Sequence, residues 1–372
     1  MAKLSLTLAC GPRPLALRRR LCAALLLSPL AAGQLLAAGP TAAPAGDPLA
    51  RAALPARQPG RAVLLDVAYA GGTLVAVGER GIIARSTDEG RSWQQASVPA
   101  SATLTAVSFQ DDKHGVAVGH GGLVLATVDG GRSWQKRLDG HQVAQLMLAS
   151  AERGGREPEL AQARQLVADG PDKPLLALLR LDGRRILAVG AYNIVLQSDD
   201  DGRSWAVPDT PLDNPQGLHI YAARARGGRV LLAGEQGLIL LSEDGGKRYQ
   251  RLAAPYRGSF FTAEIAEDGG MWVAGLRGNV WHSRDGGAHW EVQRTLSQAT
   301  VTHSLLLGGK PLLSTQSGQL LRQRDDTLVP LPGAPLPPIH AILPLRSGGV
   351  LALTAAGAIA LPASAVQNFG SK

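Results

Sequence analysis

The sequence predicts an all-β protein, a seven-bladed β-propeller, on three observations. A turn motif close to Ser-x-Asp-x-Gly-x-x-Trp, called the Asp box below, recurs along the chain with a spacing near 40 residues. Such a period, with four strand-length apolar segments in each repeat, is typical of a propeller blade. The 372 residues include 45 glycines but only 4% aromatic and 18% charged residues, which is typical of many short strands joined by tight turns.

The number of blades follows from the spacing of the motif. The aspartates of five clear copies are separated by 41, 71, 44 and 41 residues, and two degraded copies follow at 315–326 and 354–365. These five aspartates are Asp88, Asp129, Asp200, Asp244 and Asp285. The long interval carries about 30 extra residues, roughly ten too few for an additional blade. Seven blades are therefore expected, with six or eight as the alternatives.

The Asp box has a structural explanation. Between the last two strands of a blade the chain must reverse tightly, and a carboxylate can accept backbone N–H bonds across the turn while glycine supplies a positive φ. The tryptophan is expected to pack between blades. Since one carboxylate recurs in five repeats, we interpret these aspartates as part of the fold and not as catalytic groups.

The extra residues of the long interval predict a helical insertion at 141–172, between blades 2 and 3. Acidic residues and proline at 157–159, an apolar stripe of Leu160, Ala163 and Val167, and Gly170 at the end favour one amphipathic helix. It is expected to pack on the propeller, with docking of a partner as the alternative.

The first 45 residues are expected to be a signal peptide and its processing region. Lys3, Arg13 and the three arginines at 18–20 precede an apolar run that is broken at Ser28 and followed by small residues. The expected organisation is thus an exported chain with a Pro/Ala-rich linker at 46–60 and a propeller at 61–366. Both cysteines, Cys10 and Cys22, lie in the signal region, so no disulfide or Cys-ligated metal is expected in the mature chain.

Removing the signal region also removes the argument for a nucleic-acid partner. Five of the 38 basic residues and none of the 30 acidic ones lie before Asp47, which leaves 33 minus 30, a net charge of +3. A charge this small gives no electrostatic support for binding nucleic acid.

The repeat places the candidate binding residues on one face of the disc. In a blade of four antiparallel strands, the turn between the second and third strands lies on the same face as the link to the next blade, and the Asp box lies on the opposite face. Loops on a rigid scaffold often carry function, and aromatic and arginine side chains are the usual anchors of protein interfaces. The residues predicted to bind a partner on this face are Arg80, Tyr192, His219, Tyr221, Glu235, Gln236, Tyr256, Arg257, Arg277 and Asn279.

Three histidines could converge on the channel. His219, His303 and His340 each occur near the start of an innermost strand, but no HxH or HxxxH spacing supports a metal site, and a polar channel lining is the expectation. No metal, cofactor or catalytic residue is therefore predicted.

Several of these segments resemble the bacterial branch of the photosystem II stability/assembly factor propellers. The resemblance lies in the turns at 78–81, 190–192, 234–237 and 275–279 and in the links at 218–221 and 255–261. It covers nearly all of 61–360 and fades in the last two blades.

The resemblance implies a non-enzymatic accessory protein in the periplasm. Photosynthetic members hold an assembly intermediate of a membrane complex through an arginine-rich patch, which would fall on Arg80 and Arg277 here. The non-photosynthetic branch is associated with exporters of the resistance-nodulation-division type, so the periplasmic domain of such a transporter is the second expected partner.

Two other function classes use Asp-box propellers. A sialidase-like glycoside hydrolase would need an arginine cluster and a Tyr-Glu nucleophile pair; the segment that normally supplies the first arginine is absent, and Glu79 and Glu235 recur at one repeat position. A carbohydrate-binding propeller cannot be distinguished from a protein-binding one by sequence.

Overall fold

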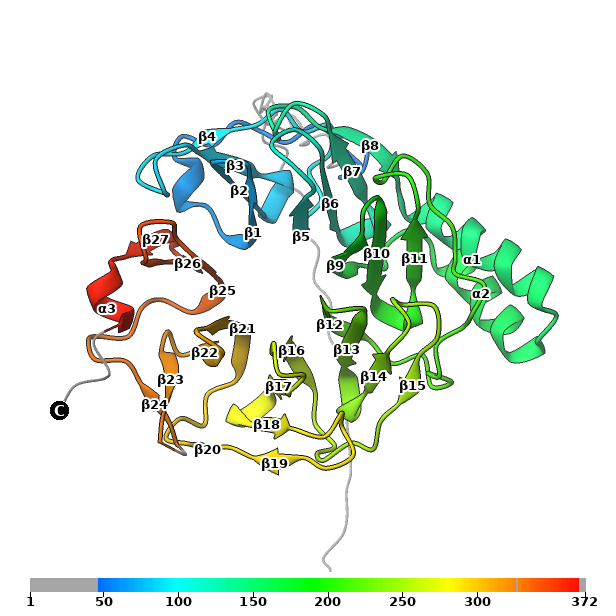
Figure 1. Cartoon of the computed structure of the whole chain (residues 1–372). Helices are drawn as coiled ribbons and strands as arrows, with labels where there is room; N and C mark the ends of the chain where they lie inside the picture. The colour runs from blue at the N-terminus through cyan, green and yellow to red at the C-terminus, as the bar shows by residue number, and fades with distance from the viewer. Residues whose placement is uncertain (1–45, 326, 368–372) are drawn as a thin grey trace, which may run out of the picture. The chain divides into compact units, whose positions relative to one another are not determined.

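The computed structural model describes residues 46–325 and 327–367, and the prediction of seven blades is confirmed. Seven sheets, antiparallel apart from one short outer strand in the sixth, surround a central channel, with the first long strand of each blade innermost (Figure 1). The predicted signal peptide at 1–45 and both cysteines lie outside the described residues. None of the helices in the described part of the chain has the length and apolar character needed to cross a membrane.

The strands follow one another blade by blade. Their bounds are, for blade 1, β1 (Leu64–Ala70), β2 (Thr73–Gly78), β3 (Ile83–Ser86) and β4 (Gln94–Gln95); for blade 2, β5 (Leu104–Phe109), β6 (Gly115–Gly119), β7 (Val124–Thr127) and β8 (Gln135–Leu138); for blade 3, β9 (Leu175–Asp182), β10 (Arg185–Gly190) and β11 (Val195–Ser198); for blade 4, β12 (Ile220–Arg226), β13 (Arg229–Gly234), β14 (Ile239–Ser242) and β15 (Gln250–Arg251).

The second half of the ring continues in the same order. Blade 5 holds β16 (Phe260–Ile265), β17 (Met271–Gly275), β18 (Val280–Ser283) and β19 (Glu291–Val292); blade 6 holds β21 (Val301–Leu307), β22 (Lys310–Thr315), β23 (Leu320–Arg324) and β24 (Thr327–Pro330), with β20 (Arg294–Thr295) parallel to β24; blade 7 holds β25 (Ile339–Pro344), β26 (Val350–Thr354) and β27 (Gly357–Leu361), followed by α3 (Ala363–Gln367).

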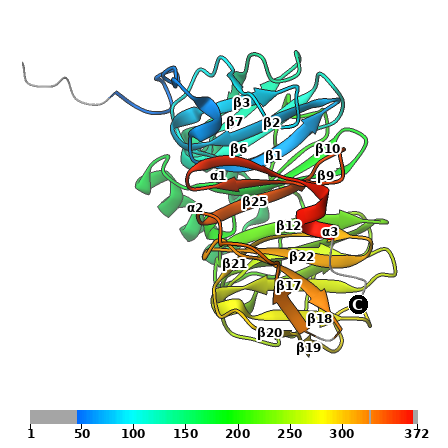
Figure 2. The same cartoon turned by 90° about the vertical axis from the view of Figure 1, so that its left-hand side faces the viewer.

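The hydrophobic core is divided among the seven interfaces between blades. Each of seven clusters of buried side chains joins two neighbouring blades. The cluster that closes the ring joins Leu64 and Leu74 of blade 1 to Leu351 and Leu353 of blade 7. Figure 2 shows these two blades next to each other. The ring is therefore closed by packing, since no sheet in the described residues contains strands of both blades.

The Asp boxes brace the turns between the third and fourth strands. Asp129 accepts hydrogen bonds from the backbone N–H groups of Arg132 (2.9 Å) and Ser133 (3.0 Å) and from the hydroxyls of Thr127 (2.8 Å) and Ser133 (2.6 Å). Asp88, Asp200, Asp244 and Asp285 each accept from their own turn in a similar way. Hydrogen bonds from the side chain and backbone of Ser92 hold the pKa of Asp88 at about 2, so this carboxylate is ionised as the turn requires.

Removing one of these carboxylates should destabilise the fold. We expect Asp129→Ala to lower the free energy of unfolding by roughly 1–3 kcal/mol, because it strips acceptors from donors in a tight turn. Urea denaturation would measure this change. Glu243→Ala is the matched control: Glu243 directly precedes Asp244, but it forms only an exposed pair with Arg229 (3.1 Å), worth less than about 1 kcal/mol. Equal losses in the two variants would contradict the structural role.

The insertion between blades 2 and 3 contains two helices where the sequence predicted one. The helix α2 (Glu157–Asp169) matches the prediction, whereas α1 (Gly140–Gly154) was not predicted. Asp139 and Gln142 form a reciprocal capping box at the start of α1, and this motif was the signal that could have identified it. Val143 and Leu166 pack in the core cluster between blades 2 and 3, so the insertion lies on the outer wall of the propeller (Figure 1).

The segment predicted as a linker lies against blades 1 and 2. Leu49 is buried in the cluster between these blades. The side chain of Gln95 accepts from the Ala56 backbone (2.6 Å) and donates to the Leu54 carbonyl (3.0 Å). The short 3-10 helix η1 (Pro59–Arg61) then leads into β1.

Candidate functional site: the turn face

Five equivalent 3-10 turns define one face of the propeller, called the turn face below. They connect the second and third strands of blades 1 to 5 and are η2 (Glu79–Gly81), η3 (His120–Gly122), η4 (Ala191–Asn193), η5 (Glu235–Gly237) and η6 (Leu276–Gly278). The antiparallel topology brings the links between blades to this same face and the Asp boxes to the opposite one. It therefore brings all ten predicted binding residues to the turn face.

The middle residue of each of these turns has a left-handed backbone. The φ values are 55° for Arg80, 68° for Gly121, 54° for Tyr192, 51° for Gln236 and 58° for Arg277. Glycine adopts this conformation without steric cost, as blade 2 illustrates, whereas other residues pay for it. Four blades nevertheless keep a large polar or aromatic side chain there, and such strained positions are often found at functional sites.

Aromatic side chains form a row across blades 3 to 5 on this face. The ring centroids are 4.9 Å apart for Tyr192 and His219, 6.1 Å for His219 and Tyr221, and 5.1 Å for Tyr221 and Phe261. Lys173 Nζ lies 5.4 Å from the centre of the Tyr192 ring, within the range of a cation–π contact. We call these five residues the aromatic row: Lys173, Tyr192, His219, Tyr221 and Phe261. The row begins with the cation of Lys173 and ends with the ring of Phe261.

A β-bulge explains how two members of the row come to lie together. The pairing of β12 with β13 shifts between Ile220 and Ala222, and that of β16 with β17 shifts between Phe260 and Thr262. Tyr221 and Phe261 are the extra residues at these equivalent shifts, and a bulge redirects side chains in this way. Lys173 and Phe261 were not among the predicted binding residues, because only the bulge and the folded insertion bring them to the row.

Glu235 supplies the acidic group of the site. Its Oε2 accepts from the His219 backbone N–H (3.2 Å) and lies 3.4 Å from His219 Nδ1. The Tyr221 hydroxyl lies 3.4 Å from the same ring nitrogen. Partial burial, and then the charge of Glu235, raise the pKa of Tyr221, so this hydroxyl remains a hydrogen-bond donor at neutral pH. Donors and acceptors thus alternate with aromatic surface, an arrangement suited to binding.

The other predicted residues are not joined to the aromatic row. Arg80 is exposed on blade 1, Gln236 on blade 4, and Arg257 and Arg277 near blade 5. The half-buried ring of Tyr256 packs against Phe260 at 6.1 Å. The amide of Asn279 donates to the Leu276 carbonyl at 3.0 Å and so braces its own turn.

A polar network lines the inner strands beneath the turn face. Glu264 accepts from Arg224 Nε (3.2 Å) and the Ser304 hydroxyl (2.9 Å), while Arg224 Nη2 lies 3.4 Å from His303 Nε2. Burial, and then the charge of Arg224, lower the pKa of His303 to about 3. Burial raises the pKa of Asp66 to about 6, although this carboxylate accepts from the Val107 and Val67 backbones (2.8 and 2.9 Å).

Two of the three histidines that were expected near the channel have different partners. His219 pairs with Glu235 at the turn face, and His303 faces Arg224 on the inner strands. Across residues 46–325 and 327–367, no group of three His, Cys, Asp or Glu side chains could hold a metal ion.

A groove of about 600 Å³ opens beside the aromatic row, between the helical insertion and residues 207–215. Tyr192 lines it, and Gln162 of α2 donates to the Tyr192 carbonyl at 3.3 Å.

Pro208, in the fourth strand of blade 3, accounts for the opening of this groove. In blades 1, 4 and 5 the residue equivalent to Pro208 donates its backbone N–H to a carbonyl of the third strand. Ala96 donates to Ile83, Leu252 to Ile239 and Gln293 to Val280.

Proline has no N–H, so the fourth strand of blade 3 separates after a single bridge between Gln197 and Ala206. Pro208 stands opposite the carbonyl of Val195, and in the described residues no group donates a hydrogen bond to this carbonyl. Val195 lines the groove.

Comparison with known proteins agrees with the resemblance seen in the sequence. Residues 85–166 match the family model described as "Photosynthesis system II assembly factor YCF48". Among curated proteins no match was found.

Solved structures of similar fold include two of that factor. The structure "YCF48 bound to D1 peptide" has 17% identity and a TM-score of 0.60, over 83% of this chain and 98% of that chain. YCF48 from Cyanidioschyzon merolae has 14% identity and a TM-score of 0.61, over 83% and 97%. The WD40 propeller domain of Doa1 has 12% identity and a TM-score of 0.57, over 85% and 96%. The structural likenesses show the fold, and the family match adds that residues 85–166 are similar to that assembly factor.

Proposed function

We propose that this assembly factor-like propeller is an exported, non-enzymatic accessory protein that holds a segment of a membrane-protein complex on its turn face. The aromatic row is the observation that supports the proposal most directly. Tyrosine and arginine are enriched among the residues that contribute most to binding energy at protein interfaces, and here they gather on the face with the strained turns.

The comparisons support a peptide as the segment held. One protein of similar fold is described with a bound D1 peptide. A peptide could lay apolar side chains on Tyr221 and Phe261 and direct polar groups to Glu235 and Lys173. The partner is then an assembly intermediate of a membrane complex or the periplasmic domain of a resistance-nodulation-division transporter, as the sequence resemblance implies.

A capture experiment tests this function. The full chain, immobilised and exposed to solubilised membranes of its host, should retain one membrane protein or complex, identified by mass spectrometry. The double variant Tyr192→Ala/Tyr221→Ala should retain at least ten-fold less, because it removes two aromatic anchors from one site.

Val128→Ala is the matched control. Val128 is 61% exposed and stands on an Asp-box turn, on the opposite face, so its loss should leave retention unchanged. Capture of a glycan only, or equal loss of retention in both variants, would contradict the proposed function.

A further inference from the structure

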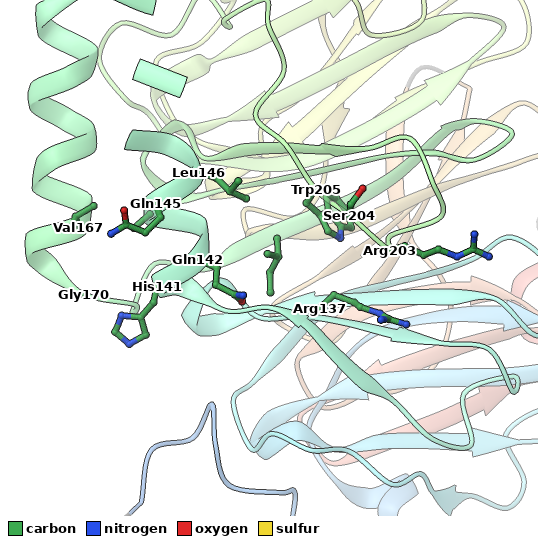
Figure 3. Close-up of a pocket in the computed structure, with 12 residues that line it drawn as sticks. Arg137, His141, Gln142, Gln145, Leu146, Val167, Gly170, Arg203, Ser204 and Trp205 are labelled. Atoms are coloured by element: carbon green, nitrogen blue, oxygen red, sulfur yellow. The ribbon is translucent and has the colours of Figure 1, made fainter. Parts of the chain in front are cut away.

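A second cavity lies on the outer wall of the propeller. It has a volume of about 550 Å³ and is bounded by β8, the start of α1, the end of α2 and the Asp box of blade 3 (Figure 3). This volume is within the usual range for small-molecule sites. None of the residues of the aromatic row lines the cavity, so an inference drawn from it does not rest on the proposed function.

The floor of the cavity is apolar. Leu138 and Trp205 are 8% and 7% exposed and belong to the core cluster between blades 2 and 3, against which Leu146 and Val167 pack. The indole N–H of Trp205 donates to the Gly202 carbonyl at 3.1 Å. The Trp205 side chain therefore offers the cavity only carbon surface.

The ionisable side chains that line the cavity are two arginines and one histidine. Arg137 and Arg203 line it and extend to the same side in Figure 3, whereas His141 lies at the other end. No aspartate or glutamate lines the cavity. Neither guanidinium group forms an ion pair within the described part of the chain. Arg203 is exposed, whereas Arg137 is half-buried like Arg180, Arg185, Arg224 and Arg229, which each have a carboxylate partner.

Arg137 carries a donor that the protein leaves unsatisfied. Its Nε is buried and has no hydrogen-bond partner among the described residues. A buried donor without an acceptor is destabilising, and a guanidinium presents its donors in a planar fork that matches a carboxylate. Because this nitrogen is fully buried, an acceptor from outside the chain cannot reach it. The terminal Nη1 and Nη2 of Arg137 are not among the buried unsatisfied atoms and have no hydrogen-bond or ion-pair partner among the described residues, so an acceptor in the cavity would bind these two donors.

We propose that this cavity binds a carboxylate carried on an apolar chain. The carboxylate receives the donors of Arg137, with Arg203 at the exposed mouth, and the apolar chain covers Trp205, Leu146 and Val167. A single half-buried guanidinium suits a monoanion, and the apolar floor offers few further donors for a dianion such as phosphate. The same chemistry is present in a free aliphatic acid and in the C-terminus of an apolar peptide.

Calorimetric titration of the full chain at low ionic strength tests the proposal. The probes are octanoate, octanamide, acetyl-Ala-Val-Leu with a free or an amidated C-terminus, and inorganic phosphate. Both acids should bind at least ten-fold more tightly than their amides, and the tighter of the two acids identifies the source of the carboxylate. Absence of saturable binding, equal binding of acid and amide, or phosphate binding as tightly as octanoate would overturn the proposal.

Variants locate the binding. Arg137→Gln should weaken octanoate binding at least ten-fold, with the melting temperature as the check on folding. Arg203→Gln, at the mouth, should weaken it at least three-fold and decides the matter if Arg137→Gln does not fold. Arg91→Gln is the matched control, because Arg91 holds in blade 1 the Asp-box position of Arg203 but does not line the cavity. Unchanged affinity in both Arg137→Gln and Arg203→Gln would refute the site.

Discussion

Replacing His303 by glutamine should make the propeller more resistant to acid. The pKa of His303 in the folded chain is about 3, below its usual 6.5. As the pH falls below 6.5 the unfolded chain takes up a proton that the folded chain does not, so stability is lost. This difference in pKa lowers the free energy of unfolding by about 3 kcal/mol between pH 7 and pH 4. The substitution His303→Gln should remove this loss.

Asp66 should act in the opposite direction. Its pKa is about 6 in the folded chain against the usual 3.8. The folded chain therefore takes up the proton first as the pH falls through 6, and this contribution to stability is lost again as the pH rises through 6. Protonation of Asp66 therefore raises the free energy of unfolding by about 2 kcal/mol at pH 4 relative to pH 7, and Asp66→Asn should remove this gain.

Urea denaturation between pH 4 and pH 7 would measure both effects. In the wild type the two contributions nearly cancel. The free energy of unfolding of His303→Gln should rise toward low pH relative to the wild type, and that of Asp66→Asn should fall. Parallel pH profiles in all three proteins would show that neither group has the protonation behaviour described above.

Loss of both exposed arginines should weaken the partner complex. We expect Arg80→Ala/Arg277→Ala to reduce the affinity for the captured membrane protein by about 2 kcal/mol or more, if both guanidinium groups are desolvated in the complex. Surface plasmon resonance on the purified complex partner would measure the change. The two side chains stand on blades 1 and 5, so a large effect of both would require a partner that spans the channel mouth.

The opposite face supplies the control for this experiment. Arg91→Ala/Arg132→Ala removes two exposed arginines from Asp-box turns and should change affinity by less than about 0.5 kcal/mol. If the Asp-box pair were the damaging one, the partner would bind the other face. If Arg277→Ala alone accounted for the whole loss, the interface would be confined to the side of the aromatic row.

The sequence by itself determined the repeat, and with it the blades, the Asp boxes and the two faces. This was possible because each blade is a local unit, and the residues that form its turn, such as Ser86, Asp88 and Gly90, are close together in the sequence. Once the strand order is antiparallel, topology alone assigns Tyr192 and His219 to one face and Asp129 to the other. The helix α2 was predicted for the same reason, since its stripe and its end are local.

Only the tertiary structure decided which of these residues meet. Tyr192, His219, Tyr221 and Phe261 belong to three blades, and their contacts depend on bulges and on the packing of neighbouring sheets. The pKa values of His303 and Asp66 arise from burial beside strands that lie far away in the sequence. The outer cavity exists because the insertion folds against blades 2 and 3. Contacts of this kind join distant parts of the chain, and no local pattern of residues encodes them.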